Sequence, residues 1–110
     1  MTITTTQTQA CFDAWIQCET LIENSAKRKI TLPRQLMKLV DECALICMGT
    51  FHAIKSYSPN IKNFALLCVG ICEECAERCE EELDEHLKEC ARICRRCSKT
   101  ISELAFSSLP

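Results

Sequence analysis

Apolar residues recur every three or four positions along most of the chain, which is the spacing of one buried helical face. Four segments follow this period: about residues 6–25, 32–56, 59–82 and 85–105. Helices of about twenty residues with short connections pack best as antiparallel neighbours. The pattern therefore predicts an all-α chain, in which residues 1–110 form a single domain, an antiparallel up-down-up-down four-helix bundle.

The breaks between these segments carry residues that start helices. Capping side chains are expected at Thr4 or Thr6, Thr31, Ser58 and Asp84. Pro33 and Pro59 are expected in the first turns of the second and third helices, where a missing N–H is tolerated.

The last two segments carry charges of opposite sign. The third is acidic, with Glu73, Glu74, Glu77, Glu80, Glu81 and Glu82, and the fourth is basic, with Lys88, Arg92, Arg95, Arg96 and Lys99. Antiparallel packing would let these side chains attract each other across the seam, although two solvated faces would give the same pattern.

Charge and hydropathy argue against two classes of protein, nucleic-acid binders and membrane-spanning proteins. A net charge of -2 without a clustered basic face argues against a nucleic-acid partner. No run of eighteen apolar residues is present, so no membrane span is expected. The start, MTITTTQTQ, lacks the features of a secretory signal. We therefore expect a cytoplasmic protein whose thiols are reduced.

Eleven cysteines are the unusual feature of this composition, and an odd number cannot all form pairs within one chain. Most are separated by three or four residues, which keeps them on one helical face. They are Cys11, Cys18, Cys43, Cys47, Cys68, Cys72, Cys75, Cys79, Cys90, Cys94 and Cys97. The same stripes carry the apolar residues of each segment, so the thiols are expected to line the core.

Antiparallel packing also predicts which thiols meet. Cys47 should lie level with Cys68 and Cys97, and Cys43 level with Cys18, Cys72 and Cys94. Cys75 should meet Cys90, and Cys79 should lie near the turn before His86. Ile54, Phe64 and Ile101 should form an apolar plug at the end that holds both termini.

Packing alone explains this pattern poorly, because Leu, Ile and Val would bury more apolar area at the same positions. Disulfides explain it poorly too, because helix axes lie about 8–10 Å apart whereas bridged Cα atoms lie within about 7 Å. Metal binding is the remaining explanation. A soft ion of low coordination number, Cu(I), suits thiolates spaced along helices, and bridging thiolates would hold several ions, on the order of ten.

Two alternatives stay open at this point. One is a zinc or general thiol-rich metal reservoir. The other is a redox protein that uses its two CxxC pairs, Cys72/Cys75 and Cys94/Cys97. No catalytic constellation is visible in the sequence, so no enzymatic activity is expected.

The CxxxCxxCxxxC run from Cys68 to Cys79, the CxxxCxxC run from Cys90 to Cys97, and the CxxxC of Cys43 and Cys47 resemble the bacterial four-helix-bundle copper storage proteins. The resemblance covers essentially the whole chain. It implies a cytosolic homo-tetramer of bundles that stores Cu(I), exchanging copper with a chaperone or an efflux system. It also implies His and Met ligands where copper enters, for which this chain offers His86, Met37, Met48 and His52.

Overall fold

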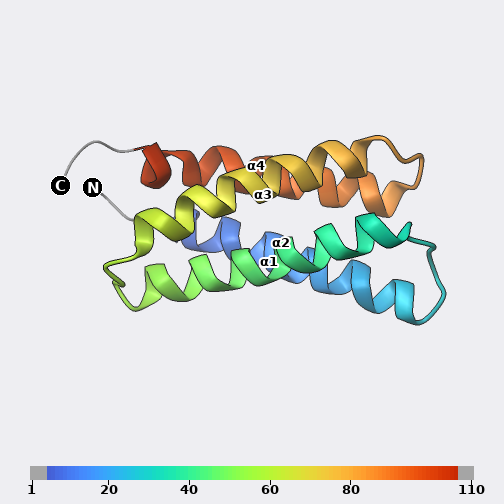
Figure 1. Ribbon diagram of the computed structural model, residues 1–110, viewed down its shortest axis with the longest axis horizontal. Coiled ribbons are helices and arrows are strands. Elements are labelled where there is room, and N and C mark those ends of the chain that lie inside the picture. The colour runs from blue at the N-terminus through green and yellow to red at the C-terminus, as the bar shows by residue number, and fades with distance from the viewer. Residues whose placement is uncertain (1–4, 107–110) are drawn as a thin grey trace.

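A computed structural model describes residues 5–106 of the chain (Figure 1). These residues form four α-helices: α1 (Thr5–Ala26), α2 (Arg34–Lys55), α3 (Ile61–Glu80) and α4 (Glu85–Phe106). Each helix packs against two others: α1 against α2 and α4, and α3 against α2 and α4. The predicted antiparallel four-helix bundle is confirmed.

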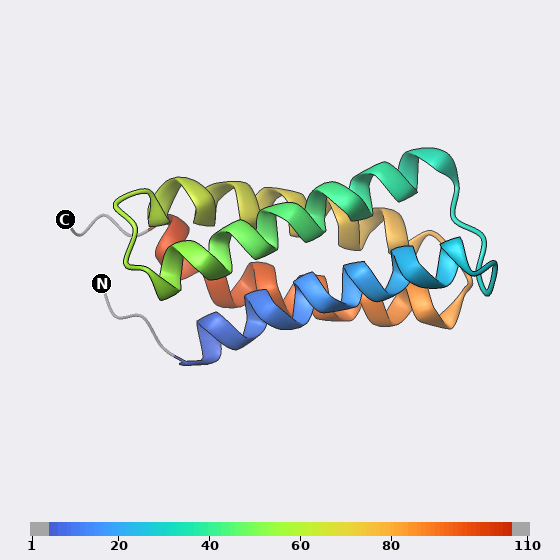
Figure 2. The same ribbon diagram turned by 90° about the horizontal axis from the view of Figure 1, so that it is seen from below.

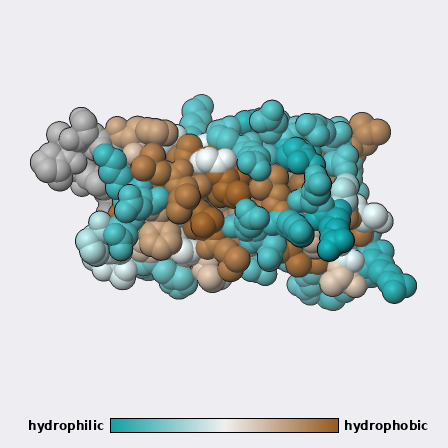
Figure 3. All heavy atoms as spheres, in the orientation of Figure 1, coloured by the Kyte–Doolittle hydropathy of each residue, from teal (hydrophilic) through white to brown (hydrophobic). Residues whose placement is uncertain are grey.

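The bundle is elongated, measuring 45 × 22 × 21 Å. Both views show four near-parallel rods, with the first and last helical turns at the same end (Figures 1 and 2). The α1–α2 loop and the α3–α4 turn lie together at the opposite end. No helix among residues 5–106 combines the length and the hydropathy that crossing a membrane requires. Apolar side chains also gather on the outward face of α2 and α3 (Figure 3).

Two predicted helix starts are each two residues too early, because α2 begins at Arg34 and α3 at Ile61. Pro33 precedes α2 instead of lying in its first turn, and its carbonyl accepts the first helical hydrogen bond, from the Met37 N–H at 2.9 Å. Ser58 and Pro59 form a separate tight turn before α3, in which the Ile61 N–H bonds the Ser58 carbonyl. Proline's fixed φ suits both positions, so composition alone does not distinguish them.

Of the other expected caps, one is confirmed, one is wrong and one lies outside the described residues. The Asp84 carboxylate accepts a hydrogen bond from the His86 N–H at 2.7 Å, so Asp84 caps α4 as predicted. Thr6 lies inside α1, which begins at Thr5, and is not its cap. Thr4 lies outside the described residues.

Apolar side chains close both ends of the core. Ile54 and Ile101 are buried at the end that holds the termini, with Phe64 half-buried. The opposite end buries a second apolar set: Leu21, Ile30, Leu32, Leu36 and Leu87. Between these two sets, the cysteines line the middle of the core together with smaller apolar side chains such as Ala14, Val40 and Ala76.

Candidate metal centre

All eleven cysteines are fully buried, with free thiols and no exposed surface. They come from all four helices, and the helical period places each set on the inward side of its helix. The prediction that the thiols line the core is confirmed. Ten of the eleven fall into three close groups.

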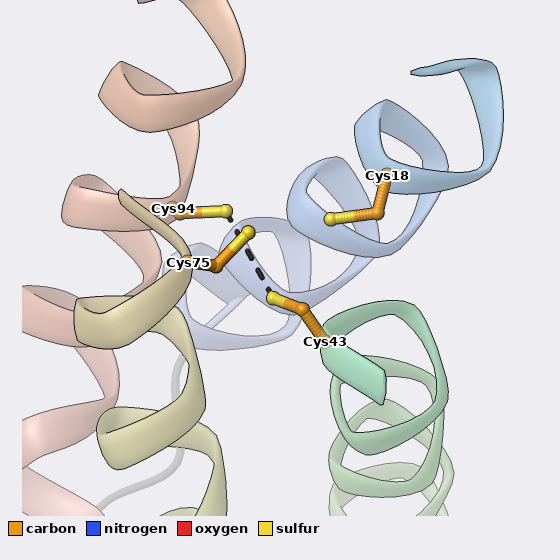
Figure 4. Close-up of side chains that lie close together, drawn as sticks. All are labelled: Cys18, Cys43, Cys75 and Cys94. Atoms are coloured by element: carbon orange, nitrogen blue, oxygen red, sulfur yellow. Dashed lines mark hydrogen bonds between the residues drawn. The ribbon is translucent and has the colours of Figure 1, made fainter. Parts of the chain in front are cut away.

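The first, the four-helix group, takes one cysteine from each helix: Cys18, Cys43, Cys75 and Cys94. Their sulfur atoms all lie within 4.8 Å of one another. Figure 4 shows the four side chains converging on one point, with the Cys43 and Cys94 sulfurs 3.9 Å apart. Such a convergence gives four soft donors to a single position.

The second, the terminus-side group, is made of Cys47, Cys68, Cys72 and Cys97. The Cys47 and Cys72 sulfurs are 3.5 Å apart, and the Cys68 and Cys97 sulfurs are 3.7 Å apart. Here α3 contributes two thiols, α2 and α4 one each. The register predicted for Cys47 with Cys68 and Cys97 is confirmed.

The third, the turn-side group, is made of Cys75, Cys79 and Cys90. Cys75 also belongs to the four-helix group, so one sulfur links the two. Cys79 lies one residue before the end of α3, close to the turn, as predicted. The predicted meeting of Cys75 with Cys90 is confirmed as well.

The groups form one array instead of three isolated sites. Cys43 of the four-helix group lies 4.0 Å from Cys47 and 3.9 Å from Cys72, sulfur to sulfur, and both of these belong to the terminus-side group.

Cys11 lies outside the three groups. Its sulfur interacts with those of Cys68 and Cys97, which raises the pKa of the Cys11 thiol, and burial raises it further. The sulfur array therefore continues past the terminus-side group to Cys11.

Without metal, the thiols form hydrogen bonds with one another within the core. Cys18, Cys47 and Cys72 each have a raised pKa, chiefly because of hydrogen bonding with the Cys43 sulfur, and burial adds to the effect. The same three hydrogen bonds lower the pKa of Cys43, with Cys18 the largest contributor. A cation that displaces these protons would find its ligands already assembled.

The donor set favours a soft ion. A metal–thiolate bond is about 2.3 Å long in zinc sites, so sulfurs within 4.8 Å of one another can share one ion. Thiolates select Cu(I) or zinc over hard ions such as magnesium or calcium. Each monovalent ion would also balance the charge of one thiolate, which limits the cost of burying charge.

None of the four His and Met residues expected where copper enters is a member of the three cysteine groups. His86 is exposed and contacts the Asp84 carboxylate at 3.1 Å. His52 is exposed on α2, and its ring centroid lies 5.9 Å from Trp15 and 5.4 Å from Phe51. Neither histidine belongs to a group of close metal-ligating atoms among the described residues. Met37 and Met48 are half-buried on α2.

A polar link between α3 and α4 supports the array. Glu73 accepts hydrogen bonds from Arg95 and from the hydroxyl of the buried Ser98, and Arg95 also pairs with Glu80 at 2.7 Å. The attraction expected across this seam is therefore present at Arg95, whereas Arg92 pairs with Glu89 of its own helix and Arg96 pairs with Asp13 of α1. The hydrogen bond from Ser98 to Glu73 was not predicted from the sequence. A serine at a core position, one residue after Cys97, was the available signal for a buried polar contact. This link fixes the helices that carry seven of the eleven cysteines.

The model of the copper storage protein family, Csp, matches residues 2–106. The chain belongs to this family. The predicted resemblance is thereby confirmed over nearly its whole length. No curated protein sequence matches the chain.

Two solved structures of copper storage proteins share the fold of this family member. One is the Cu(I)-bound copper storage protein BsCsp3, at 26% identity and a TM-score of 0.82, covering 90% of this chain and 94% of that one. The other is apo-Csp3, copper storage protein 3 from Bacillus subtilis, at 27% identity and a TM-score of 0.78, covering 90% and 95%. In both comparisons the likeness spans 90% of this chain.

Proposed function

We propose that this chain stores several Cu(I) ions, on the order of ten, on its eleven core cysteines. One observation carries the proposal: the sulfurs form a continuous, fully buried array, not one closed site. Family membership and the likeness to a Cu(I)-bound copper storage protein support the choice of ion. Bridging thiolates would let neighbouring ions share sulfurs along the bundle axis.

Zinc is the second candidate, because each four-sulfur group offers the ligand number of a structural zinc site. Zinc would use each group as a closed tetrahedron. It would leave the contacts between groups, such as Cys43 with Cys72 at 3.9 Å, without a role. The continuity of the array therefore favours Cu(I).

A redox function through the CxxC pairs is less well supported. Cys72 and Cys75 fall in different groups, and so do Cys94 and Cys97. All four have no exposed surface, whereas thiol exchange needs an accessible thiolate. The same burial supports ion binding instead of turnover of an organic substrate, so the proposed role is not enzymatic.

The cellular setting is part of the proposal. Eleven free thiols need a reducing compartment, which favours the cytosol. The protein would act as a homo-tetramer and would exchange Cu(I) with a chaperone or an efflux system. His86, Met37, Met48 and His52 remain proposed as ligands where copper enters.

Anaerobic titration of the reduced protein with Cu(I), against a competing chelator, tests the function. Saturation at many ions per chain is expected, with zinc displaced by Cu(I). Saturation at two or three ions, together with preference for zinc, would support the zinc reservoir.

A further inference from the structure

A cluster of four rings lies on the outside of the bundle where α1 meets α2, the two helices that run side by side in Figure 2. It is made of Phe12, Trp15, Phe51 and His52. The His52 ring centroid lies 5.9 Å from that of Trp15 and 5.4 Å from that of Phe51. His52 is exposed and Trp15 is half-buried. The imidazole is therefore held by its neighbours at an accessible position.

His52 differs from His86, the other histidine of the chain. The His86 ring contacts the Asp84 carboxylate at 3.1 Å. Within residues 5–106, the His52 ring makes ring contacts but no hydrogen bond or ion pair. A neutral imidazole that no carboxylate engages keeps a nitrogen lone pair for a metal ion. Of the two histidines, His52 is thus the one with its ligand atom available.

Met48 brings a second soft donor to the same place. It lies four residues before His52 on α2, and side chains at this spacing are neighbours on the helix surface, with about 5–6 Å between their Cβ atoms. Met48 directly follows Cys47, so the helical turn of about 100° per residue places it beside the core stripe and not within it. It is half-buried, in keeping with a position between the core and the surface.

We propose that the Met48 thioether and the His52 imidazole bind one Cu(I) ion on the outside of the bundle, against the face of the Trp15 ring. Both donors suit copper, and the thioether selects its monovalent state. An indole face attracts a cation within about 6 Å of its centroid, which the 5.9 Å spacing of the two rings permits. Lys55 is exposed one helical turn beyond His52, and its charge would repel a divalent ion more strongly than a monovalent one.

This outer site is separate from the sulfur array and from the loop end of the bundle. Met48 and His52 lie in the second half of α2, toward the termini, whereas Met37 and His86 lie in the first turns of α2 and α4, at the loop end (Figure 1). The four His and Met residues therefore do not share one entrance. The choice of Cu(I) rests on the proposed function, and the position of the site rests on the ring cluster. Because its donors are neutral, the outer site should bind Cu(I) more weakly than the core thiolates and fill after them.

Trp15 is the only tryptophan of the chain, so its fluorescence reports on this site. Anaerobic titration of the full reduced chain with Cu(I) should show a quenching step of about twofold after the core thiols are saturated. His52→Ala and Met48→Leu should each abolish this late step and lower the Cu(I) capacity by about one ion. His86→Ala is the matched control, because it removes the other histidine at the opposite end of the bundle. This variant should keep the late step.

A late step that survives in either His52→Ala or Met48→Leu would overturn the inference, and so would a wild-type chain without that step. Equal quenching by Zn(II) would overturn the assignment to a soft ion. Circular dichroism should show all variants equally helical, since neither side chain is fully buried. If the core bound no Cu(I) but one ion still quenched Trp15 through His52, the storage function would be refuted and the outer site would stand.

Discussion

Cys43 and Cys72, on the neighbouring helices α2 and α3, hold their sulfur atoms 3.9 Å apart. Cys43 belongs to the four-helix group and Cys72 to the terminus-side group, so this contact joins the two. Cys75 joins the four-helix group to the turn-side group in the same way, by belonging to both. The core therefore resembles a chain of overlapping positions, and the loss of a linking sulfur should disturb more than one of them.

Replacing Cys43 with serine should lower Cu(I) capacity by about two ions or more, because its sulfur contacts Cys47, Cys72 and Cys94. Cys11→Ser is the matched control. Cys11 lies outside the three groups, so about one ion should be lost. Anaerobic titration of both variants makes the comparison. Equal losses would mean that the links between groups do not matter.

Alkaline pH should destabilise the metal-free bundle. The folded pKa values of Cys18, Cys47 and Cys72 are raised, chiefly by hydrogen bonding to Cys43, from an ordinary value of 9.0. Below pH 9.0 both folded and unfolded chains keep these protons, so their contribution is complete. Above it the unfolded chain releases protons that the folded core retains, and stability falls by about 1.4 kcal/mol per pH unit for each such thiol.

Urea unfolding of reduced apo-protein between about pH 7 and 10.5 would measure this slope. Cys18→Ala should flatten the profile, because the variant has one thiol fewer to titrate. A stability that rises between about pH 7 and 9 and does not fall above pH 9 would show that thiols with lowered pKa, such as Cys43, dominate instead.

The link between α3 and α4 should respond unequally to the loss of its two carboxylates. Glu73→Ala leaves the buried Ser98 hydroxyl without its acceptor, which should cost about 1–3 kcal/mol of unfolding free energy. Glu80→Ala removes only an exposed pair with Arg95, and its effect should be smaller. Adding Ser98→Ala to Glu73→Ala should restore part of the loss. Chemical denaturation of the wild-type chain, Ser98→Ala and these three variants would decide, and a double variant whose loss equals the sum of the two single losses would argue against the link.

The end of α2 offers a stabilising change. Tyr57 has φ 54 and is 80% exposed, and the next N–H, of Ser58, bonds back to the Ala53 carbonyl at 2.9 Å. This is a helix-ending motif in which glycine is favoured at the left-handed position. Tyr57→Gly should therefore stabilise the fold by about 1 kcal/mol.

Thermal unfolding would detect this gain as a rise in Tm of about 4–8 °C. Tyr57→Ala is the control, since it removes the ring but keeps a Cβ in the left-handed conformation. If alanine stabilised as much as glycine, the tyrosine ring and not the backbone would be responsible.

The helical period was sufficient to predict the bundle and the inward side of every cysteine. Register followed from short antiparallel connections, which is why the meeting of Cys47 with Cys68 and of Cys75 with Cys90 could be predicted. Helix starts were less predictable, because Pro59 fits a turn before a helix as well as the first turn within one. The division into groups depends on side-chain directions across four helices. It could not be read from spacing alone, and neither could the hydrogen bond from Ser98 to Glu73.

The central claim is that the core sulfurs hold the copper, and one titration tests it most directly. Replacing Cys72, Cys75 and Cys94 with serine removes members of all three groups while changing little volume. A buried hydroxyl without a hydrogen-bond partner costs about 1–3 kcal/mol, so circular dichroism should first show that the variant is still helical. Anaerobic Cu(I) titration should then show a capacity lower by several ions than that of the wild-type chain. Full wild-type capacity in the triple variant would contradict the account, because the copper would then be bound elsewhere.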